Sequence, residues 1–427
     1  MLKTLDLRGK SEGLTENLPR PSISQNLPID VVQDIISQVK DKGDAALVDY
    51  TKRFDGVSLD HLEVDQQELK QAFESLPQDL RQALVAARES IRDFHEHQKN
   101  DPKTYMRDGV VVREILKPVK RAGCYVPGGR ASYPSTVLMT AIPALVAGVK
   151  EVIVCVPPDK DGKVSPVTLG AAYCAGVHRV FSVGGAQAVA AMAFGTESVP
   201  KVDVIAGPGN IYVSLAQRQV AGQVGVPSAF AGPSEVVVIA DETTNYDYAA
   251  IDVVVQAEHG PHGLAWLITW SAQAGEKINN AIEKLVELSP RKQEIISTLE
   301  EGGYIVLVDG PEQAMQISNE IAPEHLELMN SDPESLVEMI TNAGAIFMGP
   351  YSPASVGDYI AGPSHVLPTY GSAHFASALG IDDFIKHLHV IELDQQGLNK
   401  VAPHVVAIAQ AEGLVAHSES VRLRWKG

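Results

Sequence analysis

The run EVIVCV at residues 151–156 is followed by RVFSV (179–183), VDVIA (202–206) and EVVVIA (235–240), four short and almost wholly apolar segments. Continuous apolar runs of this length are typical of strands that are buried on both faces. Helical stretches separate them, namely VTLGAAYCAG (167–176), AQAVAAMAFG (186–195) and IYVSLAQRQVAG (211–222). This alternation predicts a doubly wound α/β unit built around a parallel sheet.

The same alternation continues towards the C-terminus. The helical stretch YDYAAIDVVVQAEH (246–259) precedes three further apolar runs, LAWLITW (264–270), YIVLVD (304–309) and AIFMG (345–349). Helical segments lie between these runs as well. The chain is therefore predicted to contain a second α/β unit of similar size.

The flanking segments have other patterns. Residues 1–25 are polar and proline-punctuated, which predicts an extended arm. IDVVQDIISQVKDKG (29–43) and DLRQALVAARESIRDFHEHQK (79–99) have the spacing of amphipathic helices. GVVVREILKPV (109–119) is rich in β-branched residues and predicts a strand, whereas VAPHVVAIAQAEGLVAH (401–417) predicts a helix.

Composition excludes several classes of function. The 427 residues include 35 Lys and Arg against 53 Asp and Glu, a formal net charge of −18. An acidic surface repels phosphate backbones and anionic lipid, so we expect no nucleic-acid and no membrane partner. We expect no secretory signal, because the N-terminal MLKTLDLRGKSEGL has no apolar core, and no transmembrane helix, because no apolar stretch reaches the roughly 18 residues needed. Three cysteines without CxxC spacing fit a reducing cytoplasm.

Three glycine-rich turns follow predicted strands: VGGAQ (183–187), GPGN (207–210) and AGPS (231–234). At such turns the N–H groups of a helix N-terminus can bind a phosphate. None of them has a standard nucleotide-binding fingerprint. Two interpretations stay open. The glycines either simply close tight turns, or the three turns together form a dinucleotide site.

The C-terminal half carries candidate metal ligands. Gln256 and His259 are three residues apart at a helix end and share one face, whereas Gly260-Pro261 can turn His262 away. Asp358, in a Gly- and Ser-rich segment expected to be a loop, and His417 complete a set of N and O donors that suits Zn²⁺. The alternative is that these histidines are capping or surface residues.

Glu324 and His325 place an acid beside a base, at what the sequence predicts to be a helix start or a loop. Neighbouring titratable groups whose pKa values are pushed apart suit acid–base catalysis. The alternative is a helix-opening Pro-Glu with an incidental histidine. His365 in a further loop and Glu412 near the C-terminus add another base and another acid.

Ten motifs follow one another in a single order, and together they resemble the histidinol dehydrogenase family from about residue 30 to residue 425. They are YVPGG, STVLM, VGGAQAVAA, GPGNIYV, AGPSEVVVIAD, QAEHGP, APEHLE, GDYIAG, HVLPTYG and EGLVAH. The resemblance implies two incomplete Rossmann-like doubly wound domains, an N-terminal arm, a small C-terminal tail domain and a homodimer.

The resemblance also implies where these parts lie. Residues 1–25 would be the arm, and residues 26–124 with 238–380 the first α/β domain, which carries the zinc and catalytic loops. Residues 125–237 would be the NAD-binding domain. Residues 381–427 would be a tail that crosses to the partner subunit, so that the two active sites are shared.

By the same resemblance, four sets of residues acquire roles. The implied zinc ligands are Gln256, His259, Asp358 and His417. The implied catalytic pair is Glu324 and His325, and the implied NAD contacts are Tyr125, Gln187 and Asn210. The implied substrate contacts are Ser234, Gln256, His259, His325, Asp358, His365, Glu412 and His417.

The implied reaction is the four-electron oxidation of L-histidinol through L-histidinaldehyde to L-histidine with two NAD⁺, the last step of histidine biosynthesis. Ser364 and His262 depart from the usual family pattern. A related dehydrogenase acting on another amino- or sulfo-alcohol is therefore an alternative. Two further alternatives are a zinc hydrolase in which Glu324 activates water, and a non-catalytic metal-binding or assembly protein.

Overall fold

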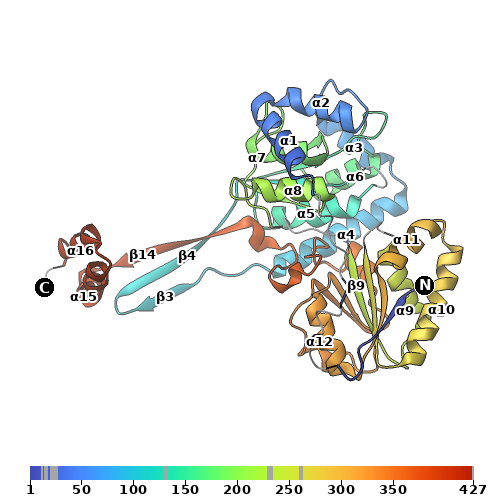
Figure 1. Ribbon diagram of the computed structural model, residues 1–427. Coiled ribbons are helices and arrows are strands. Elements are labelled where there is room, and N and C mark those ends of the chain that lie inside the picture. The colour runs from blue at the N-terminus through green and yellow to red at the C-terminus, as the bar shows by residue number, and fades with distance from the viewer. Residues whose placement is uncertain are drawn as a thin grey trace.

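A computed structural model describes residues 1–10, 13, 18–19, 27–128, 132–227, 234–258 and 263–425. Figure 1 shows two α/β lobes and an arm that projects away from both of them. Each lobe is built around its own sheet, and a third, smaller sheet forms the arm. Within the described residues, no helix is both long and apolar enough to cross a lipid bilayer.

The first lobe contains a five-stranded sheet that is parallel except for its edge strand β2. Its strands, in spatial order, are β2 (Glu63–Val64), β7 (Arg179–Ser182), β6 (Glu151–Val156), β5 (Arg121–Tyr125) and β8 (Val204–Ala206). Helices with apolar faces pack on both sides and bury the four parallel strands beyond their first residues. One side holds α1 (Ile29–Lys42), α2 (Asp44–Phe54), α7 (Gly185–Phe194) and α8 (Ile211–Val220). The other side holds α3 (Gln66–Ser75), α4 (Gln78–His97), α5 (Pro134–Val146) and α6 (Pro166–Ala175).

The second lobe contains a six-stranded, fully parallel sheet. Its order is β1 (Lys3–Asp6), β11 (Gly303–Leu307), β10 (Leu264–Thr269), β9 (Glu235–Ala240), β12 (His325–Leu328) and β13 (Ala345–Met348). One face packs on α9 (Tyr246–Ala257), α10 (Ala272–Leu288) and α11 (Lys292–Gly302). The other face packs on α12 (Pro311–Ile321) and α13 (Glu334–Val337), and α14 (Ala354–Tyr359) follows β13.

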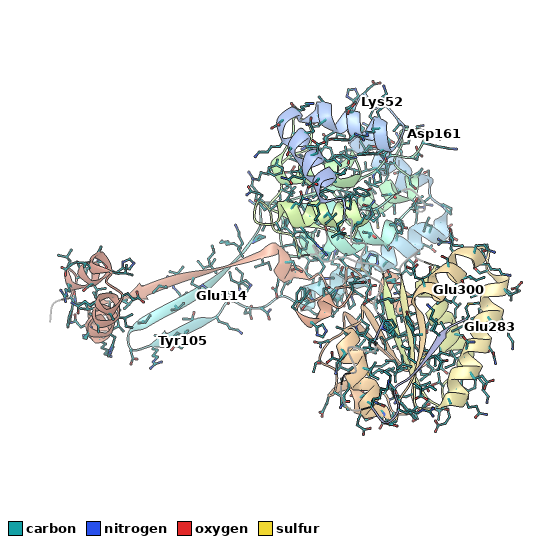
Figure 2. All side chains as sticks on the ribbon, viewed as in Figure 1. Lys52, Tyr105, Glu114, Asp161, Glu283 and Glu300 are labelled. Atoms are coloured by element: carbon teal, nitrogen blue, oxygen red, sulfur yellow. The ribbon has the colours of Figure 1, made fainter. Side chains whose placement is uncertain are left out.

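The arm is an antiparallel sheet of β3 (Thr104–Arg107), β4 (Val110–Pro118) and β14 (Ile385–Leu393). At its tip, α15 (Gln395–Ala411) packs against α16 (Val415–Arg422). Short 3₁₀ turns at Ser372–His374 and Ile381–Phe384 lead the chain into β14. Figure 2 shows Tyr105 and Glu114 on this arm, outside both lobes.

The predicted α/β class with parallel sheets is confirmed, and so are the strands predicted from the apolar runs. The expected domain boundaries differ from the observed sheets. Most of residues 26–124 belongs to the five-stranded lobe, because α1 to α4 pack on that sheet and β2 and β5 are two of its strands. Residues 3–6 are an edge strand rather than a free arm, since their backbone pairs with β11.

Three local expectations were wrong. The segment at Glu324 and His325 enters strand β12, where its backbone pairs with β9 and β13. The segment expected to be a loop around Asp358 contains helix α14. The single helix expected at 401–417 is divided, because Gly413 has a positive φ of 70° and ends α15.

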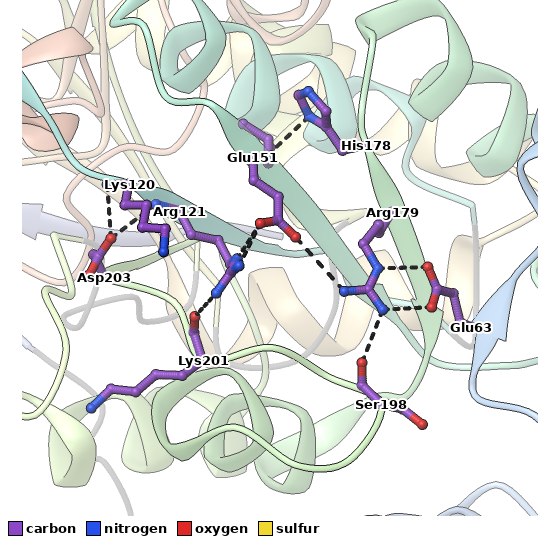
Figure 3. Close-up of polar contacts among 10 residues, drawn as sticks. Glu63, Lys120, Arg121, Glu151, His178, Arg179, Ser198, Lys201 and Asp203 are labelled. Atoms are coloured by element: carbon purple, nitrogen blue, oxygen red, sulfur yellow. Dashed lines mark hydrogen bonds and ion pairs between the residues drawn. The ribbon is translucent and has the colours of Figure 1, made fainter.

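Ion pairs connect neighbouring strands of the five-stranded sheet at one end of the strands (Figure 3). Arg121 and Glu151, the first residues of β5 and β6, approach to 2.6 Å, and Arg179 of β7 lies 2.6 Å from Glu63 of β2. Arg179 also approaches Glu151 to 3.8 Å. These pairs lie at the N-terminal ends of the parallel strands. The C-terminal ends of the strands are therefore left for the glycine-rich turns.

Candidate active site

Glu324 and His325 lie where β12 begins, between β9 and the edge strand β13 of the six-stranded sheet. The carboxylate of Glu324 accepts a hydrogen bond of 3.0 Å from the backbone N–H of Glu235, and the Ser234 hydroxyl also hydrogen-bonds to it. Both side chains of the pair are almost fully buried, with exposed fractions of 7% and 4%. The predicted acid–base pair is therefore held in a site from which most water is excluded.

Burial dominates the protonation of Glu324. It raises the pKa of this carboxyl to about 7, although the charge of His325 and the hydrogen bonds from Glu235 and Ser234 act in the opposite direction. The negative charge of Asp358 raises the same pKa further. A carboxyl that titrates near neutrality can both take up and release a proton during turnover.

His325 has partners on both ring nitrogens. Its Nδ1 lies 2.7 Å from the side-chain amide of Gln256 and 3.2 Å from the backbone carbonyl of Glu235, and its Nε2 lies 3.7 Å from Asp358 Oδ1. Burial lowers the pKa of His325, but Glu324 and Asp358 outweigh burial, and the net pKa is raised. Nδ1 therefore faces both a donor, the Gln256 amide nitrogen, and an acceptor, the Glu235 carbonyl, and these contacts fit either tautomer of the ring.

His365 connects this site to the other lobe. Its Nε2 lies 3.2 Å from Thr136 Oγ1 of α5, and its Nδ1 lies 3.0 Å from the backbone carbonyl of Asp358. The neighbouring Ser364 is buried and donates a hydrogen bond of 3.0 Å to the carbonyl of Met139, also in α5. Ser364, one of the departures from the family pattern, therefore anchors the His365 loop and does not face the acid–base pair.

The predicted metal ligands are only partly brought together. Gln256 and Asp358 meet around His325, but His259 and His262 lie outside the described residues. His417 and Glu412 are exposed on the tip of the arm, away from both lobes. Among the residues that the structure describes, no three His, Cys, Asp or Glu side chains converge as a metal site. The predicted ligand set is thus incomplete within one chain.

A cavity of about 900 Å³ opens at the C-terminal ends of the strands of the five-stranded sheet. It brings together Tyr125, Gln187 and Asn210, the three residues predicted to contact NAD. Residues of α1 and α2, among them Asp34 and Phe54, form the opposite wall. Two of the three predicted glycine-rich turns border this cavity, and most of the third, residues 231–233, lies outside the described residues.

Local contacts explain why those turns need glycine. The N–H of Gly185 donates a 3.1 Å hydrogen bond to the Tyr125 hydroxyl, and burial raises the pKa of Tyr125 to about 12. Gly207 has a φ of 121°, and a Cβ there would lie 2.1 Å from the Tyr125 carbonyl oxygen. Asn210 caps α8 by accepting from the N–H groups of Tyr212 and Val213. The chain therefore runs close to the cavity at both turns.

Two contributors escaped sequence reasoning. Glu235 shapes the site through its backbone, which donates to Glu324 and places its carbonyl 3.2 Å from His325 Nδ1, and residue type does not reveal such contacts. Thr136 lies in the STVLM motif and approaches His365 from the other lobe. The one signal in the sequence was Glu235 itself, an acidic residue at the start of the otherwise apolar run EVVVIA that forms β9.

Comparisons with known proteins agree with this arrangement. The family model described as histidinol dehydrogenase matches residues 18–425. A histidinol dehydrogenase from Parasynechococcus marenigrum is 49% identical over 396 residues, which cover 92% of this chain and 90% of that protein. One from Methanocaldococcus jannaschii is 42% identical over 426 residues, 99% of this chain and 98% of that protein.

The solved structures include a close match. The crystal structure of histidinol dehydrogenase from Elizabethkingia anophelis superposes with a TM-score of 0.95 at 35% identity, and the match covers 99% of this chain and 98% of that one. Family model, relatives and fold agree over nearly the whole length. This chain therefore belongs to the histidinol dehydrogenase family and is an oxidoreductase of histidine biosynthesis.

Proposed function

We propose that this enzyme oxidises L-histidinol to L-histidine through L-histidinaldehyde, a four-electron oxidation that uses two NAD⁺. The observation that carries the proposal is the buried Glu324–His325 pair at the point where Gln256 and Asp358 meet. Family membership supports the substrate. The site also favours a cationic amino alcohol over a sulfonate, because carboxylates and no Lys or Arg act on the described pair.

His325 serves the first oxidation. Its imidazole accepts the proton of the substrate hydroxyl while the carbinol carbon loses a hydride, which leaves the aldehyde. The Glu235 carbonyl and the Gln256 amide hold the ring at Nδ1, and the carboxylates of Glu324 and Asp358 stabilise the imidazolium that forms. A raised pKa makes His325 a stronger base than a free imidazole.

Glu324 serves the second oxidation. Its carboxylate takes a proton from water, whose oxygen adds to the aldehyde carbon to form a hydrate, and the hydrate then loses the second hydride. The hydrogen bonds from the Glu235 N–H, to Oε2, and from the Ser234 hydroxyl hold the carboxylate in place for this role. The two steps therefore use neighbouring groups with different tasks.

The 900 Å³ cavity fits a dinucleotide in size and in its helix N-termini. Tyr125, Gln187 and Asn210 would hold NAD there, and the bound cofactor would accept the two hydrides in turn. Gly185 and Gly207 keep the backbone close to the cavity. The family relationship supports this assignment.

A zinc ion fits the chemistry of the donors Gln256, His259, Asp358 and His417, which offer N and O atoms. When bound, it would anchor the imidazole and amine of the substrate. Ser234, His365 and Glu412 would add further substrate contacts, together with the ligands and His325. Since His417 and Glu412 lie on the arm, the proposal requires a homodimer in which the tail crosses to the partner.

The surface of the arm supports that crossing. Ile391, Ile408 and Val415 are 66%, 61% and 70% exposed in the single chain, although they are large apolar side chains. Large apolar side chains left this exposed on a projecting arm are available to pack on a partner. The three cysteines are buried and unpaired, in keeping with the cytoplasmic location that we propose.

The decisive experiment measures NADH against product. With L-histidinol, we expect about two NADH for each histidine formed, because the reaction removes four electrons. A chelator should abolish activity and Zn²⁺ should restore it. One NADH per substrate, hydrolysis without NADH, or turnover of a sulfonated diol in preference to histidinol would each reject the proposal and favour one of its alternatives.

The pH dependence of the second step should follow Glu324. Its carboxylate is the active form and its pKa is about 7, so histidinaldehyde oxidation should be slow below that pH and rise to a plateau above it. Single-turnover rates with histidinaldehyde, measured about one pH unit to either side, test this. A rate that is level across the range, or that falls with increasing pH, would contradict the role of Glu324.

A further inference from the structure

Two carboxyl groups lie inside the apolar interface between α9 and the six-stranded sheet. Asp252 and Glu327 are 7% and 1% exposed, each acts on the protonation of the other, and neither Glu327 carboxylate oxygen has a hydrogen bond of good geometry. Among the described residues, no cation acts on either of them. Burial of two carboxyls without a cation is unfavourable, and apolar residues of similar size would be more stable in such a place. Stability therefore does not explain this pair.

The strand places Glu327 on the same face as the catalytic histidine. Side chains alternate along β12, and Leu326 and Leu328 enter the core around Trp266. His325 and Glu327 consequently point to the opposite face. Their partners in the register, Val236 and Val238 of β9, belong to the core that α9 covers.

The helix supplies the matching residues. Asp252 and Gln256 are four residues apart on α9, so they lie one turn apart on the same face. Gln256 meets His325, and Asp252 meets Glu327. The two polar pairs form successive layers of one interface, and the carboxyl pair lies directly below the site.

Glu327 also reaches a third element. The backbone N–H of Ala354, the first residue of α14, interacts with its carboxyl group. Asp358 lies four residues further along that helix, one turn away, and its charge acts on Glu327. One carboxyl pair therefore joins α9, β12 and α14, which carry Gln256, His325 and Asp358 respectively.

We propose that the Asp252–Glu327 pair is a positioning element that holds α9, β12 and α14 at the spacing required for Gln256 and Asp358 to act together. Neither carboxyl touches the substrate or the cofactor. Both act through the residues one layer above them. The inference rests on the proposed function, because it assigns Gln256 and Asp358 to the zinc ion.

The test separates position from stability. Glu327→Gln preserves the shape and lets an amide N–H donate to Asp252, so its Zn²⁺ dissociation constant should stay within about threefold of that of the unmodified enzyme. The double variant Asp252→Leu with Glu327→Leu removes both carboxyls and leaves apolar side chains in their place. Its thermal midpoint should equal or exceed that of the unmodified enzyme. Its Zn²⁺ affinity, measured against a chromogenic chelator, should fall about 10- to 100-fold, together with kcat for histidinol.

Val237→Ala is the matched control, because Val237 is fully buried on the opposite face of β9. It should lower the thermal midpoint without changing Zn²⁺ affinity. A double Leu variant that binds Zn²⁺ and turns over like the unmodified enzyme overturns the inference, as does a Glu327→Gln variant that is as impaired as the double Leu variant. If the unmodified enzyme binds no Zn²⁺, the proposed ligand set fails, and the kcat ratio of the Leu and Gln variants still decides the positioning role.

Discussion

Replacing Glu324 with Gln should stop the reaction halfway. The amide can still accept the hydrogen bond from the Glu235 N–H, so the shape of the site is kept, but it cannot take a proton from water. Loss of a general base typically costs about 10²- to 10⁴-fold, and we expect that loss in histidinaldehyde oxidation. Histidinol oxidation, which uses His325, should fall by less than about tenfold. The enzyme should then release aldehyde after a single NADH.

The measurement is a pair of single-turnover experiments, one started with histidinol and one with histidinaldehyde, followed by NADH absorbance. Glu242→Gln, an exposed change of the same type, is the control and should behave like the unmodified enzyme. Equal losses in both steps would mean that Glu324 has a general structural role. Intact aldehyde oxidation would mean that another group activates the water.

The strands of both lobes could be predicted from the sequence because they are buried on two faces. EVIVCV and EVVVIA have no polar side to obscure the signal, and both form central strands. HLEL was not predicted as a strand, since two of its four residues are polar. Those polar residues belong to the site and to the layer below it, so function masks the strand pattern at the place where the site is built.

Chemistry-bearing residues were easier to predict than their surroundings. Glu324 and His325 are adjacent in sequence, and their proximity needs no fold. Their protonation depends on burial and on Asp358, which reaches the site through tertiary packing. The position of His417 on an arm could not be inferred from the helical pattern of its segment, because the arm consists of strands more than 250 residues apart, β4 and β14.

Two inactive variants should restore each other if the tail crosses between subunits. His325→Gln damages the body of the site, and His417→Ala removes the proposed zinc ligand on the arm, so each homodimer should be nearly inactive. In a hybrid dimer, the body of the His417→Ala chain meets the intact tail of the other chain, and one site becomes complete. Random mixing of equal amounts makes half of the dimers hybrid, so about a quarter of the unmodified activity should return.

Co-expression of the two variants with different tags, followed by tandem purification, isolates the hybrid, which should have about half of the unmodified activity. A hybrid of His325→Gln with Asp358→Ala is the matched control, because both changes lie in the body and no exchange of tails can complete a site. Recovery in the first hybrid alone requires that His417 serves the partner's site. Equal inactivity of both hybrids would place His417 with its own chain, and the arm would then have to fold back to reach Gln256 and Asp358. In the single chain, β14 pairs along its whole length with β4, from Ile385 opposite Pro118 to Leu393 opposite Val110, which holds the arm extended and favours the crossing.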